Sequence, residues 1–302
     1  MNVTQPGNTE HKCADQLMQG QNMLLEMIAL RKPLSDILTA LAQFMESQAP
    51  EIICSVLLLE EDGIHLKHGA APSLPGGLIT AINGSSIGPR AGSCGTAAFR
   101  GETVFVEDIA SDPLWTDYRN VFLLRGLHAC WSTPIFDEEH RVLGTFAIYR
   151  RTPSLPEPIH LQLIDVATRI AAISISRSRL DERLRRSEHQ LALIYETVSD
   201  ILFLLEVQPD KRFRFISVNR AFLSATGLKE EQVIHKYVEK VVPPSAQGRV
   251  FENYWKAIHE KKPVQWEEES LNLNGRKTVV RVSPVFDEAG VCTNLVGIAY
   301  PQ

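Results

Sequence analysis

The chain has 302 residues and a net charge of −5, with 44% hydrophobic and 22% charged residues. This length is typical of about two domains, and the composition is that of an ordinary soluble globular protein. The slightly acidic balance gives no electrostatic reason to expect a nucleic-acid partner.

Targeting and cross-linking signals are also missing from the sequence. The polar residues 1–12 lack the basic and apolar regions of a signal peptide. No uninterrupted apolar run approaches the ~20 residues that a membrane segment needs. The cysteines are odd in number and form no CxxC pair: Cys13, Cys54, Cys94, Cys130 and Cys292. We therefore expect no zinc site or disulfide framework, and we expect a reducing, cytoplasmic location.

The first half of the chain mixes helices with strand hairpins. After a polar tail, the pattern predicts two helices, which end before Pro33 and Pro50. The elements predicted next are a hairpin, a short helix, a helical turn, a strand and a second hairpin: residues 52–60 with 64–69, 78–82, 95–100, 103–107, and 127–136 with 142–149. Hairpins rather than βαβ units favour an α+β fold with an antiparallel sheet.

A long helix is predicted from about Pro158 to about Asp200. Its apolar residues alternate in steps of three and four: Val166, Ile170, Ile173, Leu180, Leu184, Leu191, Ile194 and Val198, with Arg177 and Ser187 at the two remaining heptad positions. A heptad seam favours a left-handed coiled coil. We therefore expect a homodimer through residues 166–198. The alternative is an amphipathic helix that lies on its own domain.

The second half repeats the antiparallel pattern. Strands are expected at residues 199–207 and 212–218, Asn219 caps a helix that ends near Ala225, and short helical segments precede three further strands at residues 265–273, 278–286 and 291–300. The fold class is therefore α+β, with two domains, each an antiparallel sheet flanked by helices, joined by a long coiled-coil helix.

Five segments of the first domain resemble a GAF domain. They are residues 92–98 (GSCGTAA), 102–108 (ETVFVED), 112–115 (DPLW), 126–135 (GLHACWSTPI) and 142–147 (VLGTFA). His128 departs from that pattern, because Arg is usual there. The likeness is to GAF domains of bacterial sensor kinases and cyclic-di-GMP signalling proteins.

Four segments of the second domain resemble a PAS domain of the S-box type. They are residues 219–222 (NRAF), 226–227 (TG), 230–234 (EEQVI) and 282–290 (VSPVFDEAG). His235 departs from the pattern, because Gly is usual there. The expected organisation is a tail at residues 1–20, a GAF sensory domain at 21–177, a helical linker at 178–190 and a PAS domain at 191–302.

Six residues are candidates for ligand binding in the GAF-like domain. Cys94 precedes a helical turn, where a helix N-terminus lowers a thiol pKa; the alternative is a small buried residue in a tight loop. Cys130 lies in an apolar strand, and His128 could ligate haem or donate to a ligand carbonyl. Aromatic residues could line the same site: Trp115, Tyr118 and Trp131. Core packing is the alternative for each of these residues.

No motif specifies a cofactor or a metal site. Haem, flavin and other small molecules stay open as ligands. Covalent attachment of a bilin or of a photosensory flavin is not supported, because the sequence lacks the Cys-His pair of bilin attachment and the Asn-Cys-Arg-Phe motif of photosensory flavin domains. It also lacks a P-loop, a G-x-S-x-G and an HExxH motif.

The resemblance implies a sensory input module that binds a small molecule and relays a helix shift to a histidine-kinase or cyclic-di-GMP output. It implies no enzymatic activity of this chain itself. Two alternatives stay open: a GAF-type free methionine sulfoxide reductase that uses Cys94, and a dimerisation scaffold without ligand. The reductases also need a loop cysteine, and residues 112–118 contain none.

Overall fold

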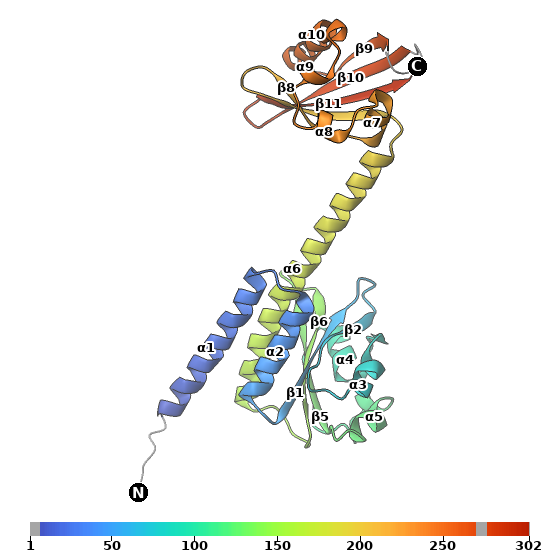
Figure 1. Cartoon of the computed structure of the whole chain (residues 1–302). Helices are drawn as coiled ribbons and strands as arrows, with labels where there is room; N and C mark the ends of the chain where they lie inside the picture. Colours follow the sequence, from blue (N-terminus) through green and yellow to red (C-terminus); the bar gives the residue numbers. More distant parts are fainter. Residues whose placement is uncertain (1–6, 270–276, 302) are drawn as a thin grey trace. The chain divides into compact units, whose positions relative to one another are not determined.

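The computed structural model describes residues 7–269 and 277–301. The chain divides into an N-terminal unit that ends at Arg183 and a C-terminal unit that begins at Leu184. Each unit is an antiparallel sheet with flanking helices, as predicted (Figure 1).

The N-terminal sheet has six strands in the order β3-β2-β1-β6-β5-β4. Their bounds are β1 Ile52–Leu59, β2 His65–Ala70, β3 Ser85–Ser86, β4 Val104–Val106, β5 Ala129–Phe136 and β6 Val142–Arg150. In the central β5–β6 ladder Cys130 lies opposite Tyr149, and Ser132 lies opposite Ala147. Because side chains alternate along a strand, this register decides which residues share a face.

Helices cover both faces of this sheet (Figure 1). One face carries α1 Gly7–Ala29, α2 Leu34–Gln48 and the first half of α6 Pro158–Thr197; the other carries α3 Gly76–Ile82, α4 Gly92–Arg100 and α5 Arg119–Leu123. Each face encloses its own apolar core. Trp131 belongs to the core under α2 and α6, whereas Cys94, Cys130 and Trp115 belong to the core under α4.

The first helix begins earlier than expected. α1 starts at Gly7, within the range predicted as a polar tail. The sequence explains this, since no proline lies between Gly7 and Ala29 to interrupt a helix. α1 also approaches α2 closely, because a side chain at Gly20 would overlap the ring of Phe44.

The long helix α6 has two different halves. Val166 and Ile170, the first two positions of the predicted seam, are only 7% and 5% exposed because they pack inside the N-terminal core. The five apolar seam positions that follow within α6 are between 49% and 65% exposed: Ile173, Leu180, Leu184, Leu191 and Ile194. The alternative of a helix lying on its own domain therefore holds for the first half of α6.

The apolar first half of α6 also has the length and composition of a membrane-spanning helix. Half of that stretch is buried within the protein. We therefore treat it as the core helix of the N-terminal unit.

The C-terminal sheet has five strands in the order β8-β7-β11-β10-β9. Their bounds are β7 Ile201–Val207, β8 Phe213–Val218, β9 Val264–Glu269, β10 Lys277–Phe286 and β11 Cys292–Pro301. The helices α7 Arg220–Thr226, α8 Glu230–Val233, α9 Val238–Val241 and α10 Pro244–Glu260 lie along it (Figure 1). Aromatic rings fill the core beneath α10, among them Phe213, Phe251, Tyr254, Trp255 and Trp266.

The predicted elements agree with the structure, with short additions. β3, α5 and α9 were not predicted, and the end of the strand expected at residues 265–273 lies outside the described residues. His235 has a φ of +62°, a backbone conformation that glycine adopts without a Cβ penalty. This accounts for the glycine that is usual at this position of the PAS pattern.

Candidate functional site

The candidate site lies on the α4 face of the N-terminal sheet, where the first turn of α4 meets β5. Gly92 begins α4 with a φ of +61°, and a Cβ there would lie 3.8 Å from the ring of Trp115 and 3.9 Å from that of Tyr118. The left-handed φ favours glycine at this position, where the helix begins beside two aromatic rings. Cys94 follows in the first turn and is buried.

A chain of hydrogen bonds ties α4 to the sheet. Trp115 Nε1 donates to Ser93 Oγ at 3.1 Å, and Ser93 Oγ donates to the carbonyl oxygen of Cys130 at 3.0 Å. Cys94 Sγ lies 3.8 Å from Tyr149 Oη. Because Tyr149 is opposite Cys130 in the ladder, the two thiols and the phenol form one cluster.

Three buried hydroxyls extend this cluster. Ser55 lies 3.5 Å from Tyr149 Oη, and Ser132 and Thr145 share the same face of the sheet. All three are fully buried. Ser132 Oγ and Thr145 Oγ1 have no hydrogen-bond partner among the residues that the structure describes. Buried polar groups are normally hydrogen-bonded, so these two hydroxyls are ready donors or acceptors for a polar atom beside Cys94.

The surroundings separate the two thiols chemically. The neighbouring Cys130 thiol, with the nearby hydroxyls of Ser132, Tyr149 and Thr145, lowers the pKa of Cys94 against the opposing effect of burial. Burial, together with the neighbouring Cys94, raises the pKa of Cys130 well above its ordinary value. Cys94 is therefore the more acidic thiol of the two.

Four of the six predicted residues meet at this cluster. Cys94, Trp115 and Cys130 are buried there, and Tyr118 packs at its edge. Trp131 does not join them, because consecutive strand residues face opposite ways; its Nε1 donates to the Ser154 carbonyl at 2.9 Å on the other face.

His128 lies just before β5 and is half-buried. Its backbone N–H donates to the Arg150 carbonyl at 2.8 Å, and its carbonyl accepts from Ile109 at 2.7 Å. These contacts assign its backbone a structural role at the end of the sheet.

The sequence interpretation missed the hydroxyl residues of the cluster and Tyr149. Strand alternation offered a signal for them. Counting in twos from Cys130 reaches Ser132, and counting in twos along the next strand joins Thr145 to Tyr149. Which of these pairs lie opposite one another depends on the hairpin register.

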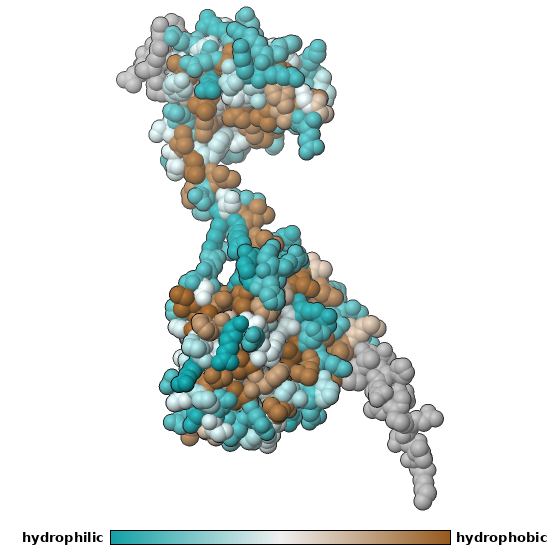
Figure 2. Space-filling view, turned by 180° about the vertical axis from the view of Figure 1, so that it is seen from behind, coloured by the Kyte–Doolittle hydropathy of each residue, from teal (hydrophilic) through white to brown (hydrophobic). Residues whose placement is uncertain are grey.

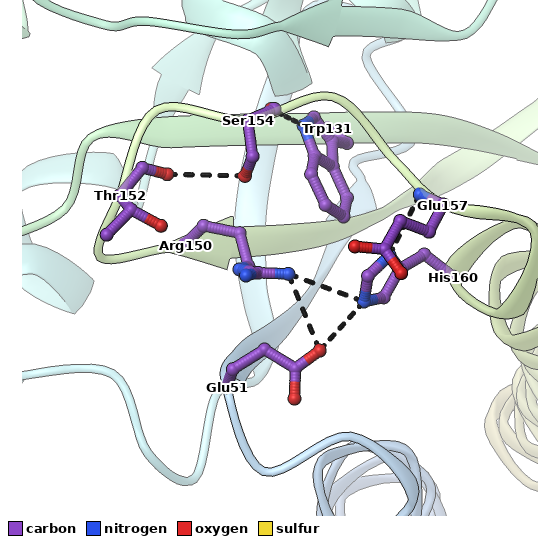
Figure 3. A network of polar contacts seen from close by, with 7 residues as sticks. All are labelled: Glu51, Trp131, Arg150, Thr152, Ser154, Glu157 and His160. Atoms are coloured by element: carbon purple, nitrogen blue, oxygen red, sulfur yellow. Dashed lines mark hydrogen bonds and ion pairs between the residues drawn. The ribbon is translucent and has the colours of Figure 1, made fainter.

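A second polar network holds the start of α6 (Figure 3). His160 is buried; its Nδ1 accepts from the Glu157 backbone N–H at 3.0 Å, so its Nε2 carries the proton and donates to Glu51 Oε1 at 3.0 Å. Arg150 Nη1 also reaches Glu51 Oε1, at 3.4 Å. The hydrogen bond from His160 lowers the pKa of Glu51, with a smaller contribution from Arg150. This network joins the first turn of α6 to β6 and to the residue before β1.

Two arginines hold α6 further along the same unit. Arg177 donates to the carbonyl of Ile28, and Arg179 donates to the carbonyls of Leu59 and Leu143. Arg177 is thus already engaged with α1, although it occupies a heptad position.

The last turn of α6 is bonded to the C-terminal unit. Ser217 Oγ donates to Tyr195 Oη at 3.1 Å, and the Arg220 backbone N–H donates to Glu196 Oε2 at 3.0 Å. The buried Asn219 donates to the Asp200 carbonyl at 2.8 Å and caps α7 by accepting from Phe222 N–H at 3.0 Å, as predicted. The end of α6 is therefore fixed to β8 and α7.

The turn between β1 and β2 brings three potential metal ligands together. Atoms of Glu60, Asp62 and His65 lie within 4.8 Å of one another. Asp62 already hydrogen-bonds the His65 ring at 2.5 Å, which lowers the pKa of Asp62 to about 2. Asp62 and His65 are therefore satisfied by each other, and the turn gives no further indication of a metal.

Comparisons with known proteins agree with the two-unit structure. Residues 30–175 match the model of the GAF domain, and residues 195–301 match that of the PAS fold. Over 284 residues, 94% of this chain, the sequence is 30% identical to the methyl sulfide methyltransferase-associated sensor of Methanosarcina acetivorans, and it spans 26% of that protein's length.

Solved structures resemble each unit separately. The GAF domain of a phosphoenolpyruvate-protein phosphotransferase from Coxiella burnetii has a TM-score of 0.46 and 16% identity, covering 56% of this chain and 98% of that one. A PAS domain from Colwellia psychrerythraea has a TM-score of 0.33 and 18% identity, covering 38% of this chain and 95% of that one.

Proposed function

This chain carries a GAF domain at residues 30–175 followed by a PAS-fold domain at residues 195–301, and from that premise we propose that it is the cytoplasmic sensory input module of a signal-transduction protein. The GAF domain receives a chemical stimulus at the cluster around Cys94, and α6 relays the change to the PAS domain. The sensor named above is similar over 94% of this chain, which supports a sensory role rather than a catalytic one.

The observation that carries the proposal is the attachment of a single helix to both domains. His160 bonds the first turn of α6 to Glu51 of the GAF domain, and Tyr195 and Glu196 bond its last turn to the PAS domain. A shift of α6 that starts at one end must therefore either move or break the hydrogen bonds at the other.

The exposed seam of α6 supports a parallel homodimer. Figure 2 shows hydrophobic surface along the stretch of the helix that follows the GAF domain, and its exposed seam residues include Leu180, Leu184, Leu191 and Ile194. Burying each such side chain is worth roughly 1.5–3 kcal/mol before ordering costs. Because Arg177 is bonded to Ile28, the paired region begins at Leu180 rather than at Val166.

Ser187 interrupts this paired region. A polar residue at a core position weakens a coiled coil and limits its alternative registers. Such a helix suits two arrangements of similar energy, which is what a switch needs. The output of the switch, a histidine kinase or a cyclic-di-GMP enzyme, is then carried by a longer chain or by a partner.

Deletions within α6 test the relay in a fusion of this chain to a histidine-kinase catalytic core. Removing seven residues, 184–190, keeps the seam in phase and should preserve the response to a GAF stimulus. Removing four, 185–188, rotates the PAS domain relative to the seam and should abolish it. Equal responses from the two deletions would contradict the relay.

A further inference from the structure

We propose that Cys94 and Cys130 are a redox pair that responds to hydroperoxide by forming a reversible intramolecular disulfide. This inference rests on the proposed sensory function and names its stimulus. Cys94 is the residue that reacts with the oxidant, and Cys130 is the residue that resolves the product.

Three observations place Cys94 and Cys130 beside each other. Ser93, next to Cys94, bonds the Cys130 carbonyl at 3.0 Å. Tyr149 lies opposite Cys130 in the ladder, and its hydroxyl lies 3.8 Å from Cys94 Sγ. Both sulfur atoms therefore border the same phenol, with the first turn of α4 held against β5.

The two cysteines differ in the way that such a pair requires. Cys94 is 8% exposed and Cys130 is 0% exposed, so a small oxidant reaches Cys94 first. The donors around Cys94 favour its thiolate, which is the nucleophilic form of cysteine. Cys130 stays protonated because burial raises its pKa.

The unpartnered hydroxyls supply a further reason. Oxidation of Cys94 adds an oxygen atom to its sulfur, and that oxygen needs hydrogen-bond partners in a buried site. Ser132 Oγ and Thr145 Oγ1 are buried on this face without partners among the described residues. They can donate to the thiolate and to the new oxygen.

The chemistry balances in two steps. The Cys94 thiolate attacks one oxygen of the hydroperoxide, the O–O bond breaks, and the leaving alkoxide or hydroxide takes a proton, which gives a Cys94 sulfenic acid. The Cys130 sulfur then attacks the Cys94 sulfur. The S–O bond breaks, and the hydroxyl leaves as water with the Cys130 proton. An external dithiol returns two electrons and two protons and restores both thiols.

The test uses the full chain with Cys13, Cys54 and Cys292 changed to Ser, so that only Cys94 and Cys130 remain. After hydrogen peroxide and quenching by alkylation, the intact mass should fall by two hydrogens, and digestion should yield one Cys94–Cys130 peptide that dithiothreitol releases. Adding Cys130→Ser should leave a Cys94 sulfenic acid that dimedone traps. Separate oxidation of both thiols, or linkage between chains, would overturn the proposal.

Two controls keep the result interpretable. Cys54 is also buried but packs on the opposite face of the sheet, so a chain that retains Cys54 and Cys130 without Cys94 should form no intramolecular disulfide. Ser132→Ala keeps both thiols and should slow the peroxide reaction by about two- to ten-fold, the effect of one hydrogen bond; an unchanged rate would contradict the role of the hydroxyls. Failure of these chemical tests would overturn the redox pair only, because the relay through α6 is tested separately by the deletions.

Discussion

Tyr149 and Arg150 are consecutive residues of β6, and the side chain of each belongs to a different polar network of the GAF domain. The Tyr149 hydroxyl meets the Cys94 thiol on the α4 face, and the Arg150 guanidinium meets Glu51 beside His160. The Cys94 cluster and the hydrogen bonds that hold the start of α6 therefore meet at adjacent residues of β6. In the proposed relay, a displacement of β6 at Tyr149 reaches the start of α6 through this adjacency.

The hydrogen bonds of His160 at the start of α6 should contribute measurably to the free energy of unfolding of the GAF domain. His160→Ala removes two hydrogen bonds and a buried ring, and should lower the free energy of unfolding by about 2–3 kcal/mol. His160→Gln should lose less, because glutamine at the third helical position also accepts from the preceding backbone. Urea unfolding measures both, with the exposed His189→Ala on the same helix as control. Equal midpoints for His160→Ala and His189→Ala would contradict this role.

The same network predicts a dependence on acid pH. The folded state lowers the pKa of Glu51 from its ordinary 4.5, chiefly through His160, so its contribution is present above that value and is lost as pH falls through the lower folded pKa. Glu51→Gln should therefore flatten the stability curve of the GAF domain below about pH 4.5. Urea midpoints across pH 3–6 measure it. A slope identical to that of the unmodified chain would count against the network.

Glycine at position 235 should stabilise the PAS domain more than the histidine present there. His235 holds a φ of +62° while its N–H donates to the Phe215 carbonyl at 2.8 Å. His235→Gly relieves that backbone and should stabilise the domain by about 0.5–1 kcal/mol. The neighbouring Lys236→Gly, without a positive φ, should destabilise it. Thermal unfolding distinguishes them, and destabilisation by both would show that the strain is absent.

The sensory function predicts no turnover of methionine sulfoxide. The GAF-type reductases also need a loop cysteine, and the corresponding residues 112–118 of this chain contain none. Incubation with free methionine sulfoxide and dithiothreitol should therefore give no methionine above the Cys94→Ser variant. Turnover that requires Cys94 would make this chain an enzyme.

The sequence predicted the two folds because the hydrophobic periodicity, the turn residues and the family motifs all indicated the same elements. It predicted one dimer seam over residues 166–198 and did not show that the first part of this seam is buried in the GAF domain. A stripe of apolar residues looks the same whether it faces its own core, as Val166 does, or solvent, as Leu191 does. The site was predicted in part, since Cys94 and Cys130 were singled out. The hydrogen bond between Glu51 and His160 could not be predicted from a local sequence pattern, because the two residues are 109 positions apart.

The dimer through the α6 seam is the central claim, and two isomeric variants test it most directly. Leu191 lies on the seam and is 65% exposed, whereas Leu193 lies off the seam and is 51% exposed. Light scattering across a dilution series should show a dimer for the unmodified chain and for Leu193→Glu, and a monomer for Leu191→Glu, because only the last places a charge between paired helices. A chain that is monomeric at high micromolar concentration, or equal behaviour of the two variants, would contradict the account.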